Sequence, residues 1–159
     1  MGEEKRAVLV GLDTGNDREA YERSMDELEE LARALFLCPA ARLVQHAPKQ
    51  NAGTLIGSGK AEELKALVLT AGACIVLCNE MLTPMQVRNL EDLLDTEVLD
   101  RTGVILEIFA LRAKTKEAKL QVESARLRYI LPRVAGMGRN LSRQGGGSGR
   151  LSNKGAGEE

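Results

Sequence analysis

The sequence predicts an α/β fold, in which a small, mostly parallel sheet of four strands with flanking helices precedes a long coiled-coil-like helix and a glycine-rich basic loop. Apolar runs alternate with stretches of helical periodicity through residues 1–100. Strands that are apolar all along are typical of parallel sheets covered on both faces. Heptad spacing then runs through 103–133, and eight glycines follow within 134–157. We therefore divide the chain into an α/β part, 1–100, and a helix-and-loop part, 101–159.

The strands are predicted from short apolar runs between turn residues. The four main ones are 7–12, 41–47, 74–78 and 97–100, and Thr54-Leu55-Ile56 is predicted as a short additional strand. Connections between parallel strands should be right-handed.

The helices of the first part are predicted from periodicity and from their ends. One helix covers 18–36, with Asn16 or Asp17 as its cap. A second covers 60–70 and ends at Gly72. A third opens at Thr83-Pro84, with threonine as the cap and proline at the first position, and reaches about residue 94.

A single long helix is predicted over 103–133, where Pro132 should kink or stop it. Its apolar seam, spaced by alternating four and three residues, consists of Val104, Ile108, Leu111, Thr115, Ala118, Val122, Ala125 and Tyr129. A second stripe consists of Leu106, Phe109, Ala113, Leu120, Leu127 and Leu131. Such a helix needs a helical partner, so the pattern indicates the first half of a hairpin in a truncated chain. Pairing of two copies through the exposed seam is the alternative.

Charge is strongly polarised along the chain. Residues 1–100 carry 10 Lys+Arg against 18 Asp+Glu, and residues 101–159 carry 12 against 5, so the two parts have net charges of −8 and +7. A basic part joined to an acidic part is typical of a protein that presents one end to a polyanion.

Composition excludes several other classes. No apolar run approaches the roughly 20 residues that span a bilayer. We interpret Cys38, Cys74 and Cys78 as buried, reduced thiols of a cytoplasmic protein. We expect no metal site, because the only histidine, His46, has no ligand-like spacing to the cysteines. No catalytic group is predicted: paired acids fall on solvated helix surfaces.

The turn Gly57-Ser58-Gly59-Lys60 follows a short strand and opens a helix, as a phosphate-binding loop does. A Walker A loop needs glycine where Thr54 stands and Ser or Thr where Ala61 stands. We interpret the turn as a packing feature, with a weak anion site at Gly57, Gly59 and Lys60 as the alternative. An ATP-binding or ATP-hydrolysing function would have to use this turn.

The basic loop is the most informative feature. Its arginines and amide or hydroxyl side chains alternate with glycines, and they are Arg133, Arg139, Asn140, Ser142, Arg143, Gln144 and Arg150. Glycine permits close approach of the backbone to phosphates, and arginine offers forked donors and a stacking plane. From the residues alone, an RNA-binding tip and a disordered basic linker are equally good interpretations.

The loop GMGRNLSRQGGGSG at 136–149 closely resembles the LSRQGGGxG motif of the HflX family of GTPases. Further resemblances follow in the family's order: LIGSGKAEEL at 55–64, LTPMQVRNLE at 82–91, DRT at 100–102, ILEIFA at 105–110, AKLQVE at 118–123, LPR at 131–133 and GAGE at 155–158. Together they cover nearly the whole chain. The departures are Leu55 and Glu159, where the family usually has Tyr and Thr or Ser.

The resemblance implies the N-terminal region of a ribosome-associated GTPase. Such regions contact the large ribosomal subunit and its rRNA, with the hairpin tip near the peptidyl-transferase centre, and the factor splits or rescues stalled ribosomes. In the family, GTP and Mg²⁺ would bind the G domain, which would also be a partner of this region. The sequence lacks the motifs of the G domain, so this chain should bind RNA and not catalyse a reaction. The rRNA contacts that the resemblance implies are Arg133, Gly136, Met137, Gly138, Arg139, Asn140, Leu141, Ser142, Arg143, Gln144, Gly145, Gly146 and Gly147. We add Arg150 because it is an arginine of the same basic loop.

Overall fold

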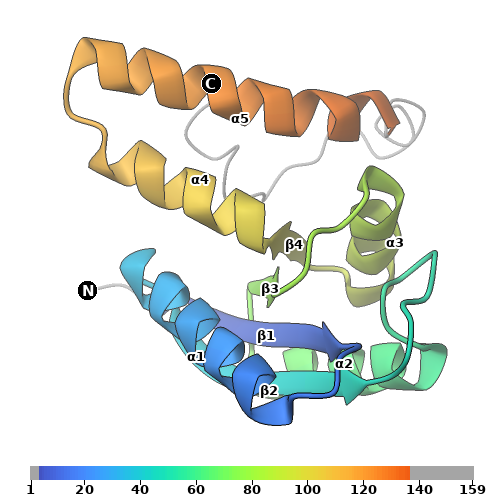
Figure 1. Cartoon of the computed structure of the whole chain (residues 1–159). Helices are drawn as coiled ribbons and strands as arrows, with labels where there is room; N and C mark the ends of the chain where they lie inside the picture. Colours follow the sequence, from blue (N-terminus) through green and yellow to red (C-terminus); the bar gives the residue numbers. More distant parts are fainter. Residues whose placement is uncertain (1–3, 137–159) are drawn as a thin grey trace.

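A parallel sheet with helices on both faces forms the body of the protein, and two further helices rise from one edge of it (Figure 1). The computed structural model describes residues 4–136. The strands are β1 (Arg6–Asp13), β2 (Cys38–His46), β3 (Ile75–Cys78) and β4 (Glu97–Asp100). The helices are α1 (Arg18–Ala34), α2 (Ser58–Ala71), α3 (Pro84–Leu94), α4 (Arg101–Arg112) and α5 (Lys116–Gly136).

The sheet has the order β2-β1-β3-β4, and every pair of neighbouring strands is parallel. The α/β class and the four main strands are thus confirmed. The chain passes from β1 to β2 on one side and then crosses to β3 on the other. The order therefore reverses between β1 and β3, where sheets of this type hold ligands beyond the carboxyl ends of the strands.

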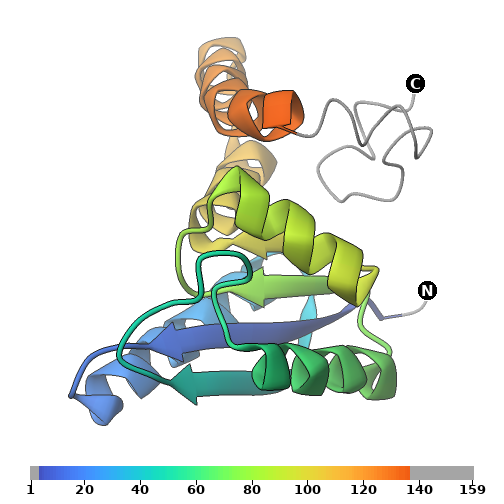
Figure 2. The same cartoon turned by 90° about the vertical axis from the view of Figure 1, so that its right-hand side faces the viewer.

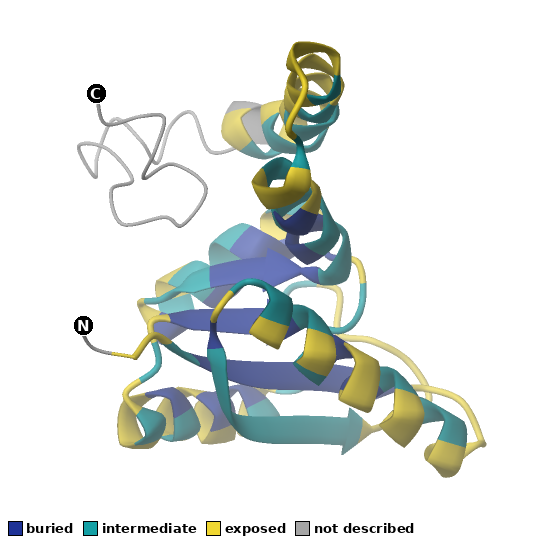
Figure 3. Ribbon diagram, turned by 90° about the vertical axis from the view of Figure 1, so that its left-hand side faces the viewer, coloured by how far each residue is buried: buried dark blue, intermediate teal, exposed yellow. Residues whose placement is uncertain are grey.

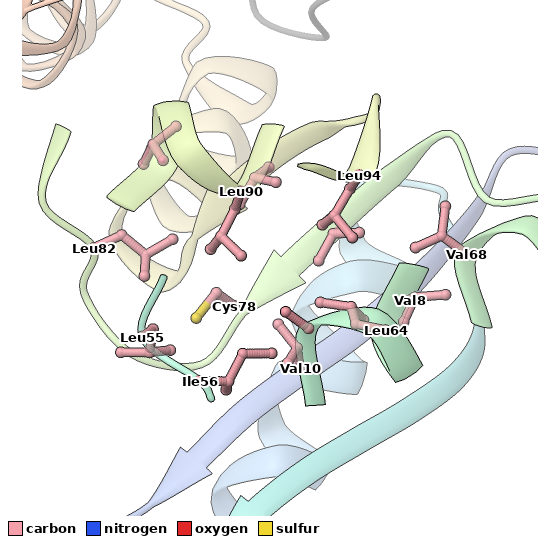
Figure 4. Packing of buried hydrophobic residues seen from close by; sticks show 14 of the residues in the cluster. Val8, Val10, Leu55, Ile56, Leu64, Val68, Cys78, Leu82, Leu90 and Leu94 are labelled. Atoms are coloured by element: carbon pink, nitrogen blue, oxygen red, sulfur yellow. The ribbon is translucent and has the colours of Figure 1, made fainter. Parts of the chain in front are cut away.

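Successive side chains of β1 point to opposite faces of the sheet, so the hydrophobic core is divided between these two faces. Val8 and Val10 point toward α2 and α3, where Leu64 and Leu90 meet them (Figure 4). Ala7 and Leu9 lie on the other face, under α1 and α4. Figure 3 shows the strands buried between these layers, except β2 at the edge, which is half-buried. A central strand that is apolar on both faces is the consequence of this arrangement.

The predicted helix ends are largely confirmed. The Asp17 carboxylate accepts a hydrogen bond from the amide of Ala20 at 3.0 Å and caps α1. Thr83 and Gln86 form a capping box with Pro84 at the start of α3. Gly72 ends α2 with φ of 63°. The start of α2 was predicted too late by two residues, since the helix begins at Ser58.

The predicted short strand at 54–56 is wrong. Only an isolated antiparallel bridge joins Asn51 to Leu55. The Asn51 side chain accepts hydrogen bonds from the amides of Gly53 and Thr54, which closes a tight turn in place of an extended strand. Leu55, at φ of 67°, and Ile56 are nevertheless buried in the core.

The prediction of one long helix over 103–133 is also wrong. Ala113 is extended, and the Thr115 hydroxyl accepts a hydrogen bond from the amide of Ala118 at 3.0 Å, so a new helix starts there. α5 folds back beside α4 (Figures 1 and 2). The heptad seam is thereby divided between two helices that pack on each other. Pro132 lies inside α5 and does not stop it.

The cysteines were predicted to be buried, and the structure corrects this for two of them. All three are free thiols, but only Cys78 is buried, whereas Cys38 is half-buried and Cys74 is exposed. Cys74 precedes the first residue of β3, so it lies outside the covered part of the strand. Among the helices of residues 4–136, none is long and apolar enough to cross a membrane.

Candidate nucleic-acid interface

Helices α4 and α5 form an arm that leaves the sheet, and Asp100 is the buried centre of the junction between the sheet and this arm. It is the last residue of β4, and its side chain is fully buried. One carboxylate oxygen accepts a hydrogen bond from the amide of Gly103 at 3.0 Å, which caps α4. The other accepts from the amide of Leu82 at 2.9 Å. A carboxylate at a helix N-terminus is also favoured by the helix dipole.

α5 returns to this carboxylate through two side chains one turn apart. The Tyr129 hydroxyl donates to Asp100 at 2.6 Å. The Arg133 guanidinium donates to Asp100 at 3.3 Å and to the carbonyl of Leu82 at 3.1 Å. It also lies 3.7 Å above the Tyr129 ring. Burial, and then the charge of Asp100, raise the pKa of Tyr129. The tyrosine therefore stays a neutral donor, and α5 is held to the sheet at its last turns.

A glycine permits the close approach of α5 to the start of α4. A Cβ atom at Gly103 would lie 2.5 Å from Cδ1 of Leu99 and 2.7 Å from the hydroxyl of Tyr129. Farther along the arm, Arg126 of α5 pairs with Glu107 of α4 at 3.2 Å, and both side chains are largely buried. The direction of α5 is thus fixed at both points by contacts to α4.

Of the predicted RNA contacts, only Arg133 and Gly136 lie in the described residues. Arg133 is mostly buried, with 17% of its side chain exposed, and its Nε has no hydrogen-bond partner among residues 4–136. Its donors thus serve the junction, and its contact with rRNA stays a prediction. The others, from Met137 to Gly147 and Arg150, lie outside the described residues. α5 ends at Gly136 and so leads directly into this segment.

The Gly57–Lys60 turn has few groups left for an anion. The amide of Gly57 donates to the side chain of Gln45 at 3.0 Å. The Lys60 ammonium lies 3.3 Å from Glu63. The α2 N-terminus has no side-chain cap, and Gly59 is exposed. The turn thus fits a packing role, and an anion that used the Gly57 amide or the Lys60 ammonium would have to displace Gln45 or Glu63.

A second polar cluster lies where the strand order reverses, beyond β1 and β3. Glu80 accepts hydrogen bonds from the amide of Leu12 at 2.8 Å and from the Tyr21 hydroxyl at 2.6 Å. Its burial raises the pKa of the carboxyl group, although the Tyr21 hydrogen bond opposes this. Arg101 donates to the Asn79 carbonyl oxygen at 2.6 Å. These bonds attach α1 to the sheet, so the cluster is internally satisfied.

His46 and Asp13 lie at the same end of the sheet, 3.1 Å apart, with His46 at the exposed end of β2. No group of three or more His, Cys, Asp or Glu residues able to hold a metal ion occurs among residues 4–136.

Sequence reasoning missed the residues that build the junction. In the sequence, Asp100 is only the last residue of a predicted strand, and Tyr129 is only a position of the predicted seam. The signal available was the segment Asp100-Arg101-Thr102-Gly103, since an aspartate directly before a helical pattern is a typical cap. Nothing in the spacing shows that Tyr129 and Arg133 reach this aspartate, because their approach depends on the turn at 113–115.

The fold and the junction define an α/β module with a two-helix arm, whose last helix runs into a basic glycine-rich segment. Residues 22–110 match the family described as the GTP-binding GTPase N-terminal region, and residues 112–159 match its middle region. The chain belongs to this family, the HflX-type GTP-binding GTPases, and corresponds to their N-terminal part.

Individual relatives agree with this assignment. The chain is 44% identical over 156 residues to the GTPase HflX of Lacrimispora saccharolytica, which covers 98% of the chain and 36% of that relative. It is 41% identical over 150 residues to the GTPase HflX of Escherichia coli, covering 91% and 34%. The chain therefore spans about a third of the length of these relatives.

Solved structures share the fold. A GTP-binding protein from the hyperthermophilic archaeon Sulfolobus solfataricus, in complex with GDP, is similar with a TM-score of 0.60 and 27% identity, over 88% of this chain and 42% of that one. A complex of SsGBP with GDP gives a TM-score of 0.65 and 28% identity, over 82% and 36%.

Proposed function

We propose that this chain is the rRNA-binding region of an HflX-type GTPase, which attaches the enzyme to the large ribosomal subunit in the cytoplasm. The attached enzyme would split or rescue ribosomes. The chain matches about a third of the length of its relatives. The part of those relatives that it does not match would bind GTP and Mg²⁺. In this division of labour the present chain contributes recognition of RNA and the remaining part contributes hydrolysis.

The observation that carries the proposal is the position of the basic segment relative to the anchored helix. Residues 101–159 have a net charge of +7 against −8 in residues 1–100. The Asp100 junction fixes the last turns of α5 to the body, and residues 137–150, here called the Gly-Arg segment, follow directly in the sequence. A cationic segment on a fixed support is suited to phosphate contacts, with glycines that permit close approach and arginines that pair with phosphate or stack on bases.

Co-sedimentation of the chain with purified large ribosomal subunits tests the proposal. The wild-type chain should bind saturably, and the Arg139→Ala/Arg143→Ala variant should lose most of this binding. Each lost phosphate contact should also lower the slope of log affinity against log salt by about 0.7–0.9.

The matched control is Arg18→Ala/Arg23→Ala. Both arginines are exposed on α1 in the acidic part, so this variant removes the same charge from the opposite end. Equal loss of binding in both variants would contradict the proposal, because general charge and not the Gly-Arg segment would then be responsible.

A second candidate, a helix-mediated oligomerisation module, is favoured by one observation. Leu120, Leu127 and Leu131 follow one another along α5 and are 64%, 47% and 60% exposed. These residues belong to the second apolar stripe and not to the seam that packs on α4. Sedimentation equilibrium of the chain beside Leu127→Lys distinguishes the candidates: a dimer that the lysine abolishes supports the module, and a monomer at all concentrations excludes it.

A further inference from the structure

The turn between α4 and α5 carries a second basic surface, at the opposite end of α5 from the Gly-Arg segment. Four exposed cations occur within eight residues around this turn, and they are Arg112, Lys114, Lys116 and Lys119. Figure 1 shows the turn at the far end of the arm, away from the sheet. We call these four residues the corner.

The corner cations are not neutralised within the described part of the chain. Arg33 and Arg42, on the α/β body, each pair with two or more carboxylates. No hydrogen bond or ion pair of the four corner side chains occurs among residues 4–136. Unlike Arg33 and Arg42, the four corner cations are thus free to bind an external anion.

The acids of the arm do not offset this charge. Glu107 and Glu123 both pair with Arg126, at 3.2 and 3.3 Å, in the middle of the arm. Among the described residues of the arm, Glu117 is the remaining carboxylate, and it lies in the first turn of α5 beside the corner. The amino end of α5 adds the positive end of a helix dipole. A concentrated positive field therefore remains at the far end of the arm.

We propose that the corner binds the phosphate backbone of double-stranded rRNA, as a second contact separate from the Gly-Arg segment. α5 has 21 residues, and such a helix is about 31 Å long, so the corner lies about that far from Gly136, the residue that precedes the Gly-Arg segment. Three of the four cations are lysines, which offer point charges and no base-stacking plane. The contact should therefore position the protein on RNA without reading sequence. This inference rests on the proposed function, since it takes the large ribosomal subunit as the source of the RNA.

The test uses the whole chain with Lys114, Lys116 and Lys119 all changed to Gln. The matched control changes Lys5, Lys49 and Lys65, which are exposed on the body, to Gln and alters net charge equally. Affinity for purified large ribosomal subunits is measured from low to physiological salt. The corner variant should lower the slope of log affinity against log salt by about two and weaken binding about 100-fold near 0.1 M salt. The body variant should stay within about twofold of wild type. Equal curves for the two variants would overturn the corner proposal.

Two further comparisons distinguish failure of this proposal from failure of the proposed function. If Arg139→Ala/Arg143→Ala abolishes subunit binding and the corner variant binds as tightly as the body variant, only the corner proposal fails. If the wild-type chain does not bind subunits, the proposed function fails, and a plain RNA duplex of about 20 base pairs then decides the corner. Weaker binding of the duplex by the corner variant supports the proposal. Loss of subunit binding with unchanged duplex binding would overturn it in favour of an acidic ribosomal protein.

Discussion

Asp100 is the residue on which the geometry of the arm depends. Its two oxygens accept hydrogen bonds from Leu82, Gly103, Tyr129 and Arg133, which belong to the segment before α3 and to both helices of the arm. A fully buried carboxylate is stable only when such donors compensate its lost hydration. The predicted RNA contact Arg133 is itself one of these donors. Substitution of Arg133 would thus disturb the support of the Gly-Arg segment as well as any contact with RNA.

Tyr129→Phe isolates one bond of this junction. The change removes the 2.6 Å hydrogen bond to Asp100 and keeps the ring that Arg133 covers. We expect the free energy of unfolding to fall by about 1.5–3 kcal/mol, since the acceptor is a buried charge. Urea denaturation measures the loss, and hydrogen exchange should show faster opening of α5 than of β1. An unfolding free energy within about 0.5 kcal/mol of wild type would contradict the role of this bond.

Glu80 should give the protein a recognisable pH dependence. Burial raises the pKa of its carboxyl group above the ordinary value, about 4.3, that it has in the unfolded chain. The folded state therefore holds the proton more tightly, and the stability that this contributes below about pH 4 is lost as the pH rises through the folded pKa. Relative to Glu80→Gln, the wild-type chain should thus become less stable between pH 4 and 7.

Urea unfolding of both proteins at pH 4 and pH 7 checks this sign. Glu62→Gln, on the exposed face of α2, is the control that should show little change in the difference. A difference between wild type and Glu80→Gln that stayed constant, or that moved in favour of wild type as the pH rose, would refute the assignment.

At the scale of the elements, the strands and the three helices of the body could be predicted because each has a local signal. The apolar run 74–78, the Thr83-Pro84 start and Gly72 all act within one turn of the chain. The break at 113–115 could not, because the heptad spacing continues across it without a gap. Periodicity records which positions are apolar and does not distinguish one helix with an external partner from two helices that pack on each other.

Gly103→Ala tests how closely the elements of the arm approach. Alanine in place of glycine inside a helix normally stabilises by about 1 kcal/mol. Here the added Cβ would lie 2.5 Å from Leu99 and 2.7 Å from Tyr129, so overpacking should reverse the sign and destabilise by about 1–3 kcal/mol. Gly59→Ala, in the first turn of α2, is the matched control, because its Cβ would meet nothing within 4 Å. Thermal unfolding of both variants gives the comparison, and a stabilised Gly103→Ala would show that α5 packs elsewhere.

At the scale of the whole molecule, charge and fold divide the chain at the same place. The acidic α/β body ends at Asp100, and the basic part begins with α4. The charge polarity was visible in the sequence, and so was the candidate RNA segment, because both depend only on composition. The support of that segment by the body was not visible, since it depends on α5 folding back to Asp100. The corner was hidden for the same reason: its lysines appear as part of a continuous helix until the turn brings them to the end of an arm.

Hydroxyl-radical cleavage of rRNA from an iron chelate tethered to the Gly-Arg segment tests the central claim most directly. The chelate is attached at Ser142→Cys in a Cys74→Ser background, which removes the exposed native thiol. Bound to large ribosomal subunits, this protein should cleave the rRNA at a small number of sites. A chelate at Thr14→Cys, exposed beyond β1 in the acidic body, should cleave far less. Equal cleavage from both positions, or none from position 142 in a chain that remains bound, would contradict the assignment of RNA recognition to this segment.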